Sequence, residues 1–326
     1  MKNFAQVAAT LAVTLAWAAD SATSSARAQD YPTGPVRIIS GFSPGSTADI
    51  SARVVGAKMG QSLGQQFVVE NRTGAASSLA ASQVARAPKD GYMLYVANVA
   101  NMVNAAMNPN LNFDIMKDFA PITLMTSTPT MLVVKPELGV KSVKELIALA
   151  KAKPDTISFG SSGVASSTHL ALELLKSQAQ VKITHVPYGG SPQVMTDLLA
   201  GRLDGFFSPA SAAMEHVRAG KLVALAVTDG KRSSFMPDLP TMIEAGVPDF
   251  ESVLWFGLVA PADTPQPIID KLSRAANEAL KSEEVAKALE AQTVARIGGS
   301  PQELRRYMEA EHKRWSAVVE SAGLRK

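Results

Sequence analysis

The sequence contains no cysteine. That absence excludes disulfide bridges, thiolate zinc sites, iron–sulfur clusters, cysteine nucleophiles and any lipid anchor attached through cysteine. Charge of either sign is also not in excess, because 32 Lys and Arg stand against 29 Asp and Glu, a net charge of +3. Nucleic-acid-binding proteins gather their basic residues on one face, whereas these are scattered, so we expect no nucleic-acid partner.

Several motifs that announce a cofactor are absent as well. No G-x-G-x-x-G follows a strand, which leaves a dinucleotide site without support, and no G-x-x-x-x-G-K supplies a phosphate-binding loop. The four histidines lie far apart and form no H-E-x-x-H or paired-ligand spacing: His169, His185, His216 and His312. We therefore expect neither a cofactor nor a metal.

Long apolar runs are scarce, and the main one lies near the first residue. Residues 7–19 are small and apolar, follow the basic Lys2, and precede Ala26-Arg27-Ala28, the small-x-small pattern that signal peptidase recognises. This run is too short to cross a bilayer core, which takes ~20 helical residues. We predict an export signal over residues 1–28, cleaved after Ala28, and a soluble, monomeric protein of the periplasm.

The remaining composition is that of a folded α/β protein. A hydrophobic share of 46% and a charged share of 19% exclude disorder, and 326 residues suggest two domains. Strands alternate with Gly-rich turns and helices, which predicts parallel sheets covered by helices on both faces. Helices are expected over 48–63 and 78–86, and strands over 36–40, 67–71, 92–97, 130–135, 156–159, 183–187, 205–208 and 222–228.

Three further helix starts are marked by capping sequences. Ser142 and Thr241 each precede a glutamate by three residues, and Ser300 precedes Pro301 and Glu303. Residues 229–252 are rich in Pro and Gly and show no periodicity, so we interpret them as a passage between domains.

One pattern suggests catalysis. Gly41-Phe42-Ser43-Pro44-Gly45 follows a strand and matches the G-x-S-x-G turn of serine hydrolases. In that turn, the N–H of the residue after the serine completes the oxyanion hole, but Pro44 has no N–H. A hydrolase that uses Ser43 is therefore a weak alternative.

A different pattern recurs four times: a strand that ends in a turn of small polar residues and opens a helix. Free N–H groups and the positive end of the helix dipole make such a turn a site for an anion. No Lys or Arg cluster accompanies the turns, so a ligand would be held by neutral donors and released easily. This combination favours a carboxylate-binding receptor over an enzyme. The turns cover residues 41–47, 73–78, 160–168 and 188–191.

At these turns the chain resembles the tripartite tricarboxylate transporter substrate-binding proteins, also called Bug receptors. The resemblance runs from Tyr31 to Trp315. Its anchors are Gly41 to Gly45 with Asp49 and Arg53, Val69 to Arg72, Lys117 to Phe119, Ser142 to Leu146, Gly160 to Gly163, His169-Leu170, His185 to Tyr188, Leu222 to Thr228, Leu239 to Thr241 and Trp255 to Leu258.

The resemblance implies a type II periplasmic-binding-protein fold, in which two α/β domains are joined by a crossing-strand hinge with a ligand cleft between them. One domain would comprise residues 29–126 and 253–326, and the other residues 127–252. The implied function is to capture a small organic carboxylate by domain closure and deliver it to membrane transporter subunits. A ligand-sensing module for a signalling partner would use the same fold, and the sequence leaves that alternative open.

The resemblance also implies the ligand-binding residues. Two of them carry open alternatives: Asp204 either binds an amino group of the ligand or pairs with Arg202, and Asn98 either contacts the ligand or reflects variation in a loop. Trp255 either lines the cleft or fills the hinge, and Asp49 is expected to interact with the dipole of its own helix. The complete set is Phe42, Ser43, Gly45, Ser46, Thr47, Asn98, Ser161, Ser162, Ser167, Thr168, Tyr188, Gly189, Asp204 and Ser208.

Overall fold

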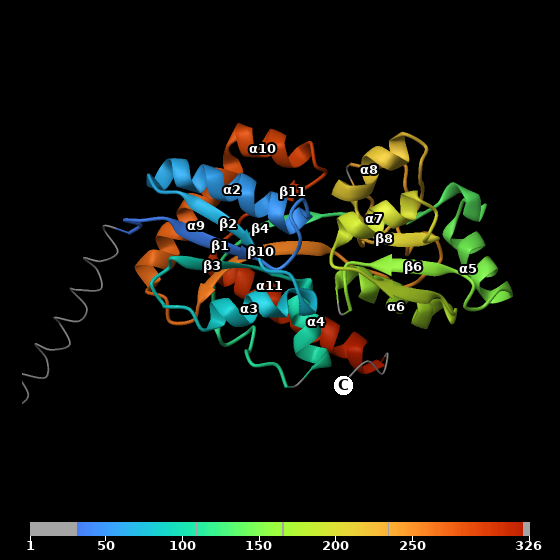
Figure 1. Cartoon of the computed structure of the whole chain (residues 1–326), viewed down its shortest axis with the longest axis horizontal. Helices are drawn as coiled ribbons and strands as arrows, with labels where there is room; N and C mark the ends of the chain where they lie inside the picture. Colours follow the sequence, from blue (N-terminus) through green and yellow to red (C-terminus); the bar gives the residue numbers. More distant parts are fainter. Residues whose placement is uncertain (1–30, 109, 165, 234, 322–326) are drawn as a thin grey trace, which may run out of the picture.

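A computed structural model describes residues 31–108, 110–164, 166–233 and 235–321. The export signal predicted over residues 1–28 lies outside the described residues. Two β-sheets lie side by side along the long axis of the molecule, each flanked by helices (Figure 1). Within the described ranges, no helix is both long enough and apolar enough to cross a membrane.

The first sheet has the strand order β11-β4-β10-β3-β1-β2. Strands β1, β2 and β3 are parallel, whereas β10 runs antiparallel to both β3 and β4. Its strands are β1 (Val36–Ser40), β2 (Phe67–Asn71), β3 (Met93–Asn98), β4 (Phe119–Thr128), β10 (Leu254–Pro261) and β11 (Ala295–Arg296).

The second sheet has the order β7-β6-β8-β5-β9, in which β6, β7 and β8 are parallel and β5 is antiparallel to β8 and β9. The prediction of wholly parallel sheets was therefore wrong. Strands β5 and β10 enter directly from the other sheet rather than through a crossover helix, so they are free to run against their neighbours. The strands are β5 (Thr130–Val134), β6 (Ser158–Ser161), β7 (Thr184–Pro187), β8 (Gly205–Pro209) and β9 (Val223–Val227).

Helices cover both faces of each sheet (Figure 1). On the first sheet, α2 (Thr47–Leu63), α9 (Gln266–Lys281) and α10 (Glu283–Glu290) lie on one face, and α3 (Ser78–Ala85), α4 (Val99–Met107) and α11 (Pro301–Ser321) on the other. On the second, α5 (Val143–Ala152) and α6 (Ser167–Ala179) lie opposite α7 (Ser191–Leu199) and α8 (Ala210–Arg218). Short 3₁₀ segments are η1 (Ala75–Ser77) and η2 (Pro136–Leu138).

The core of the first sheet contains a polar anchor. Trp255 and Trp315 are fully buried, and their indole N–H groups both donate to Glu311 Oε2, at 3.0 and 3.1 Å. The Trp255 ring also packs edge-on against Tyr307. Trp255 thus fills the interior between β10 and α11 instead of facing a cleft, which resolves the alternative that the sequence left open.

The chain passes between the sheets twice. Only Pro129 separates β4 from β5, whereas residues 228–253 connect β9 to β10. In that longer connection, Thr241 and Glu244 exchange the hydrogen bonds of a capping box, yet a turn follows and not the predicted helix. Gly246 and Pro248 follow too soon for a helix to develop. The caps at Ser142 and Ser300 do begin helices. The domain limits stay a prediction.

Candidate ligand-binding site

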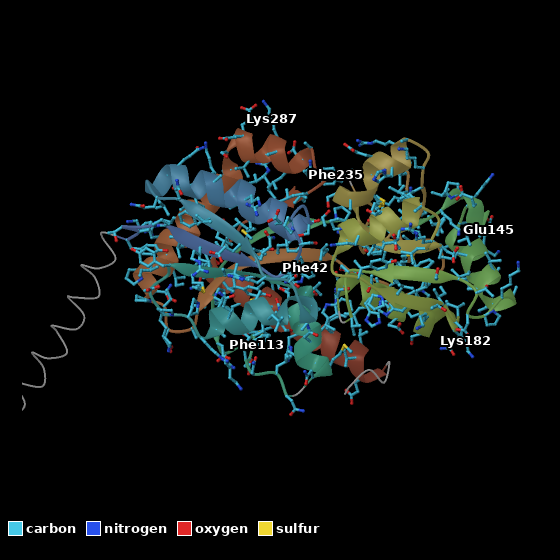
Figure 2. The ribbon with its side chains drawn as sticks, in the orientation of Figure 1. Phe42, Phe113, Glu145, Lys182, Phe235 and Lys287 are labelled. Atoms are coloured by element: carbon cyan, nitrogen blue, oxygen red, sulfur yellow. The ribbon has the colours of Figure 1, made fainter. Side chains whose placement is uncertain are left out.

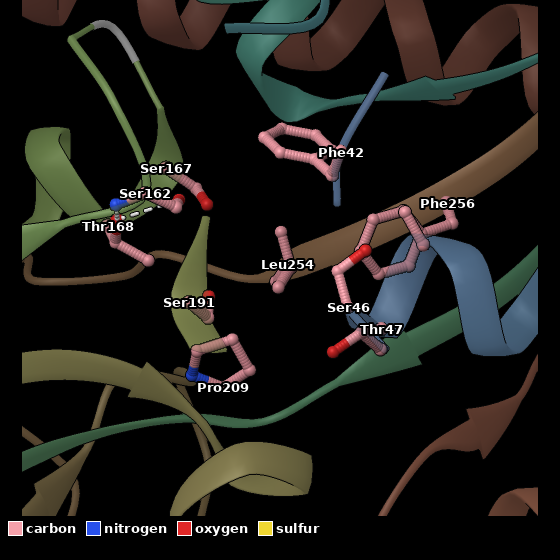
Figure 3. A pocket seen from close by; sticks show the side chains of 11 residues that line it. Phe42, Ser46, Thr47, Ser162, Ser167, Thr168, Ser191, Pro209, Leu254 and Phe256 are labelled. Carbon is pink, nitrogen blue, oxygen red and sulfur yellow. Dashed lines mark hydrogen bonds between the residues drawn. The ribbon is translucent and has the colours of Figure 1, made fainter. Parts of the chain in front are cut away.

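A cavity lies between the two sheets (Figure 3). Phe42 lies at its upper edge in Figure 3 and marks the junction of the two halves of the molecule in Figure 2. None of the 11 lining residues carries a formal charge, and six of them bear hydroxyls. The lining consists of Phe42, Ser46, Thr47, Ala48, Ser162, Ser167, Thr168, Ser191, Pro209, Leu254 and Phe256.

The cavity lies where helices begin. Its lining includes the cap and first residues of α2, the first residues of α6 and α7, and Pro209, which directly precedes α8. These helices follow β1, β6, β7 and β8, whose carboxyl ends point toward the space between the sheets. Free N–H groups and positive dipole ends therefore surround a cavity that contains no cationic side chain.

The turn between β1 and α2 forms the first wall of the cavity. Ser46 caps α2 by accepting from the Asp49 N–H at 3.4 Å, and the Asp49 carboxylate in turn accepts from the Gly45 N–H at 3.0 Å. Arg53 pairs with the same carboxylate at 2.9 Å. Asn71 also donates to it at 2.9 Å.

These donors keep the Asp49 carboxyl ionised. Burial acts to raise the pKa of this carboxyl, but the hydrogen bonds from Arg53, Gly45 and Asn71 outweigh it and hold the pKa below its usual value. Asp49 does lie in the first turn of its helix, as expected, and its hydrogen bonds also hold the turn between β1 and α2.

The loop between β6 and α6 forms the second wall with a cluster of hydroxyls. Thr168 Oγ1 accepts from the Ser162 N–H at 2.9 Å and lies 3.1 Å from Ser162 Oγ. Ser166 caps α6 by accepting from the His169 N–H at 3.3 Å, and its Oγ lies 3.0 Å from Thr168 Oγ1. In Figure 3 this cluster faces Ser46 and Thr47 across the cavity, with Leu254 between them.

The two walls touch each other. Thr47 Oγ1 and Ser211 Oγ are 2.7 Å apart and link the start of α2 to the start of α8. Beside this bond, Gly190 packs so closely on the first wall that a Cβ added there would lie 2.3 Å from Ser43 Oγ. The two halves of the molecule are therefore in direct contact beside the cavity.

A second cavity shares Phe42 and Ser162 with the first. Gly41 permits its shape, because a Cβ at that position would lie 2.7 Å from the backbone of Ser77. The lining comprises Gly41, Phe42, Gly74, Ala75, Ala76, Ser77, Ser162, Gly163, Val164, Pro187, Tyr188 and Gly189.

Eight of the residues predicted from the sequence line these two cavities: Phe42, Ser46, Thr47, Ser162, Ser167, Thr168, Tyr188 and Gly189. The Tyr188 hydroxyl is already engaged, since it donates to Asp197 Oδ2 at 2.7 Å. Tyr188 therefore offers the second cavity its ring and backbone more than its hydroxyl.

Six predicted residues line neither cavity: Ser43, Gly45, Asn98, Ser161, Asp204 and Ser208. Asn98 is 1% exposed and caps α4 by accepting from the Ala100 N–H. Ser161 and Ser208 are fully buried. Asp204 precedes β8, at the end opposite to the cavity, where it accepts from the Ser158 N–H and pairs with Lys135. Arg202 pairs with Asp197 instead of with Asp204.

Sequence reasoning missed five of the residues that line the first cavity: Ala48, Ser191, Pro209, Leu254 and Phe256. Ser191 belongs to a turn that the sequence did mark as a helix start. Leu254 and Phe256 are apolar residues of β10, and nothing local distinguishes them from core residues. Only the return of the chain to the first sheet brings them to the cavity.

The geometry offers little for catalysis. Ser43 Oγ is buried and has no hydrogen-bond partner among the described residues, so no base is placed to activate it. Ser161 Oγ does lie 2.6 Å from His185 Nε2, but Ser161 is 0% exposed and no substrate reaches it. In the described ranges, no three His, Asp or Glu side chains are grouped to hold a metal.

Comparison with known proteins places this arrangement among binding proteins. Residues 51–324 match the model of the "tripartite tricarboxylate transporter family receptor". Protein BugT of Bordetella pertussis is 34% identical over 98% of both chains. A Rhodopseudomonas palustris protein solved with adipate, Rpa4515, is 36% identical, with a TM-score of 0.86 over 90% of this chain and 98% of its own. MatC of the same species, solved with malate, is 31% identical, with a TM-score of 0.84 over 89% and 100%.

Proposed function

The chain belongs to the tripartite tricarboxylate transporter receptor family, of which Bug proteins are members, and from this premise we propose that it captures a small organic carboxylate for uptake. The ligand would occupy the cavity between the two sheets. We propose further that the protein delivers the carboxylate to the membrane subunits of a tripartite tricarboxylate-type transporter.

The uncharged cavity ringed by helix starts carries this proposal. A carboxylate there would accept hydrogen bonds from free N–H groups of α2 and α6 and from the hydroxyls of Thr47, Ser167 and Thr168. Because no cationic side chain lines the cavity, the ligand would be bound without an ion pair that has to be broken on release. This suits a receptor that must hand its ligand on.

The apolar part of the lining limits the ligand class. Leu254, Phe256 and Pro209 form a hydrocarbon surface between the polar walls. A mono- or dicarboxylate with a short apolar or aromatic body would place its polar ends on the walls and its body on this surface. The adipate and malate held by the two Rhodopseudomonas palustris proteins are small acids of this kind.

Closure of two domains would enclose the ligand. We assign residues 29–126 and 253–326 to one domain and residues 127–252 to the other, joined at Pro129 and at the longer connection. The contacts between Thr47 and Ser211 and between Ser43 and Gly190 would form as the domains close. An export signal over residues 1–28, release into the periplasm and a monomeric state complete the proposal.

A thermal-shift screen of residues 29–326 tests the proposal. The panel contains malate, adipate, benzoate and the neutral diamide of adipate. An acid present at 100 times its Kd adds about 2.7 kcal/mol to the free energy of unfolding. We expect at least one acid to raise the Tm and the diamide to leave it unchanged. A flat response to a broad series of organic acids would remove the receptor proposal.

One variant and its control locate the site. Ser167→Leu removes a lining hydroxyl and places a larger apolar side chain in the cavity, so the ligand-induced rise in Tm should disappear. Ser177→Leu makes the same change at an exposed position of the same helix and should leave the rise intact. An equal response of both variants would place the ligand elsewhere.

A further inference from the structure

Two stacked imidazole rings lie directly behind the second wall. The rings of His169 and His185 are 4.0 Å apart between centroids and inclined by 28°. His169 follows Thr168, which lines the cavity, on the first turn of α6. His185 lies on β7 and its Nε2 is 2.6 Å from the oxygen of Ser161, the residue that precedes Ser162. His169 is thus next in sequence to the cavity residue Thr168, and His185 contacts the residue next to the cavity residue Ser162.

The charged groups that face this pair come from α6. Glu173 Oε1 lies 3.5 Å from His169 Nε2 and 2.8 Å from Lys176 Nζ. Burial acts against ionisation of Glu173, but His169 and Lys176 lower the pKa of its carboxyl to about 2. Glu173 and Lys176 therefore contribute opposite charges that cancel. From β6 the pair meets the neutral hydroxyl of Ser161.

His185 is held neutral in this arrangement. Burial lowers the pKa of its imidazole to about 4, and the neighbouring His169 adds to that effect. A carboxylate placed at the start of α6 would add a negative charge beside this cluster. An opposite charge nearby favours the protonated imidazole, so a bound anion acts to raise the pKa of His185.

We propose that His185, stacked on His169, takes up a proton when a carboxylate binds at the second wall, and that His185 thereby acts as a positioning residue of the site. The inference rests on the proposed function, since it needs an anionic ligand in this cavity. The proton comes from solvent and resides on the imidazole, which becomes an imidazolium between Ser161 and His169.

Protonation would also fix the loop. A protonated Nε2 must donate to Ser161 Oγ, so the Ser161 hydroxyl hydrogen turns to the Gly163 carbonyl, 3.1 Å away. The Gly163 N–H already lies 3.2 Å from the same Oγ. With the imidazole neutral, this hydrogen is shared between two acceptors. With the imidazole protonated, each hydrogen bond of Ser161 Oγ therefore has one direction, and the loop has one hydrogen-bond arrangement when the carboxylate is bound.

The direction of the pH effect follows from linkage. Because the pKa of His185 is higher in the complex than in the free protein, affinity rises as pH falls. The rise begins at the pKa of the complex and levels off near the free value of about 4. Protonation of the free ligand has the opposite effect on affinity, because a protonated acid must release its proton to bind as a carboxylate.

Calorimetry in pairs of buffers with different ionisation enthalpies measures the coupling. The probes are adipate and malate, titrated into residues 29–326 at about pH 5.5 and about pH 8, either side of the ordinary imidazole pKa. At the lower pH, we expect wild type to take up a larger fraction of a proton per bound ligand than His185→Gln does. At the higher pH, the two proteins should take up the same fraction. The glutamine amide can still bond Ser161.

A control variant and a direct titration of the imidazoles test whether the proton uptake belongs to His185. His216→Gln changes a histidine in the last turn of α8, away from the cavity, and should behave as wild type. The imidazole proton resonances of wild type, followed against pH with and without ligand, should report a raised pKa for His185 in the complex even if His185→Gln fails to fold. Binding with unaltered imidazole titration overturns the inference alone, whereas no binding by any acid overturns the proposed function as well.

Discussion

The turn between β1 and α2 and the loop between β6 and α6 both present hydroxyls to the same cavity, but they differ in what stands behind those hydroxyls. Behind the first wall is an ion pair, Asp49 with Arg53, that keeps its charge over the ordinary pH range. Behind the second wall is a pair of stacked imidazoles, of which we propose that His185 gains charge when ligand binds. A site without charged lining residues can thus still have one electrostatically rigid side and one responsive side.

The largest effect is expected where the two walls meet. Gly190→Val adds a branched side chain at a position where even a Cβ would lie 2.3 Å from Ser43 Oγ, so the halves cannot close. We expect carboxylate affinity to fall by more than about 100-fold, the loss of roughly 3 kcal/mol of closure contacts. Isothermal titration calorimetry measures it.

A glycine that lines neither cavity supplies the control. Gly34→Val alters a residue around which no atom lies within 4 Å of an added Cβ. Its affinity should change far less, while far-UV circular dichroism should show both variants folded. Equal losses in the two variants would mean that the walls do not have to touch for ligand to bind.

The second largest effect concerns the rigid wall. Asp49→Asn keeps the size of the side chain but presents an amide to the Gly45, Arg53 and Asn71 donors. Hydrogen bonds to charged groups contribute about 1.5–3 kcal/mol each, so we expect the free energy of unfolding to fall by an amount of that order. Chemical denaturation at neutral pH measures the loss.

The same variant carries a pH signature. The pKa of Asp49 is lower in the folded protein than its ordinary value of 3.8. Its stabilising contribution is therefore present above that value and lost as pH falls through the folded pKa. The stability difference between wild type and Asp49→Asn should shrink in acid. A difference that stays constant down to about pH 2.5 would contradict the ionised state of this wall.

A smaller effect is expected from the hydrogen bond that links the walls. Thr47→Val and Ser211→Ala each remove one partner of the 2.7 Å contact. A neutral hydrogen bond contributes about 0.5–1.5 kcal/mol, so each variant should bind about 2- to 10-fold more weakly. In a double-mutant cycle the two losses should not add. Strict additivity would show that the two hydroxyls are not coupled in the bound state.

The smallest effect is expected in the connection between β9 and β10, where a substitution should change stability without changing carboxylate affinity. Asp229, in the connection between β9 and β10, has a buried Oδ2 with no partner among the described residues. Burial raises the pKa of its carboxyl to about 7, and Glu251 adds to that shift. Because the folded protein holds the Asp229 proton more tightly than the unfolded chain, this carboxyl contributes to stability below pH 3.8. That contribution is lost as the pH rises through about 7.

Asp229→Asn should therefore become more stable relative to wild type as pH rises from about 5 to about 8, with carboxylate affinity unchanged. Thermal unfolding at the two pH values checks this. Asp238→Asn, an exposed change in the same connection, should show no such trend. A pH-independent difference in Tm for Asp229→Asn would show that the carboxyl is not buried as described.

The comparison also shows what could be predicted from the sequence. The hydroxyls of Ser46, Thr47, Ser167 and Thr168 were predictable as lining residues because they stand in turns that follow a strand and open a helix, where free N–H groups gather. Asp204 and Ser208 flank or belong to β8, and sequence alone does not tell at which end of the strand, or on which side, a residue faces a cleft. Asn98 shares the cap signature of Ser46, but its side chain is buried and lines neither cavity.

Contributions from distant parts of the chain escaped prediction for a different reason. Leu254 and Phe256 read as two more apolar residues of a buried strand, and the contact between Thr47 and Ser211 joins residues 164 positions apart. The reversed direction of β5 and β10 likewise depends on the chain crossing between sheets. Such features depend on tertiary arrangement, which local periodicity does not encode.

The central claim is that helix starts and hydroxyls, without a cationic side chain, bind a carboxylate between the two sheets. Calorimetric titration of residues 29–326 with the tightest acid of the panel and with its neutral amide tests this directly. The account predicts saturable binding of the acid and affinity for the amide at least about 100-fold lower, a difference of roughly 3 kcal/mol. Equal affinity for acid and amide would contradict it, because the cavity would then be recognising shape and not charge.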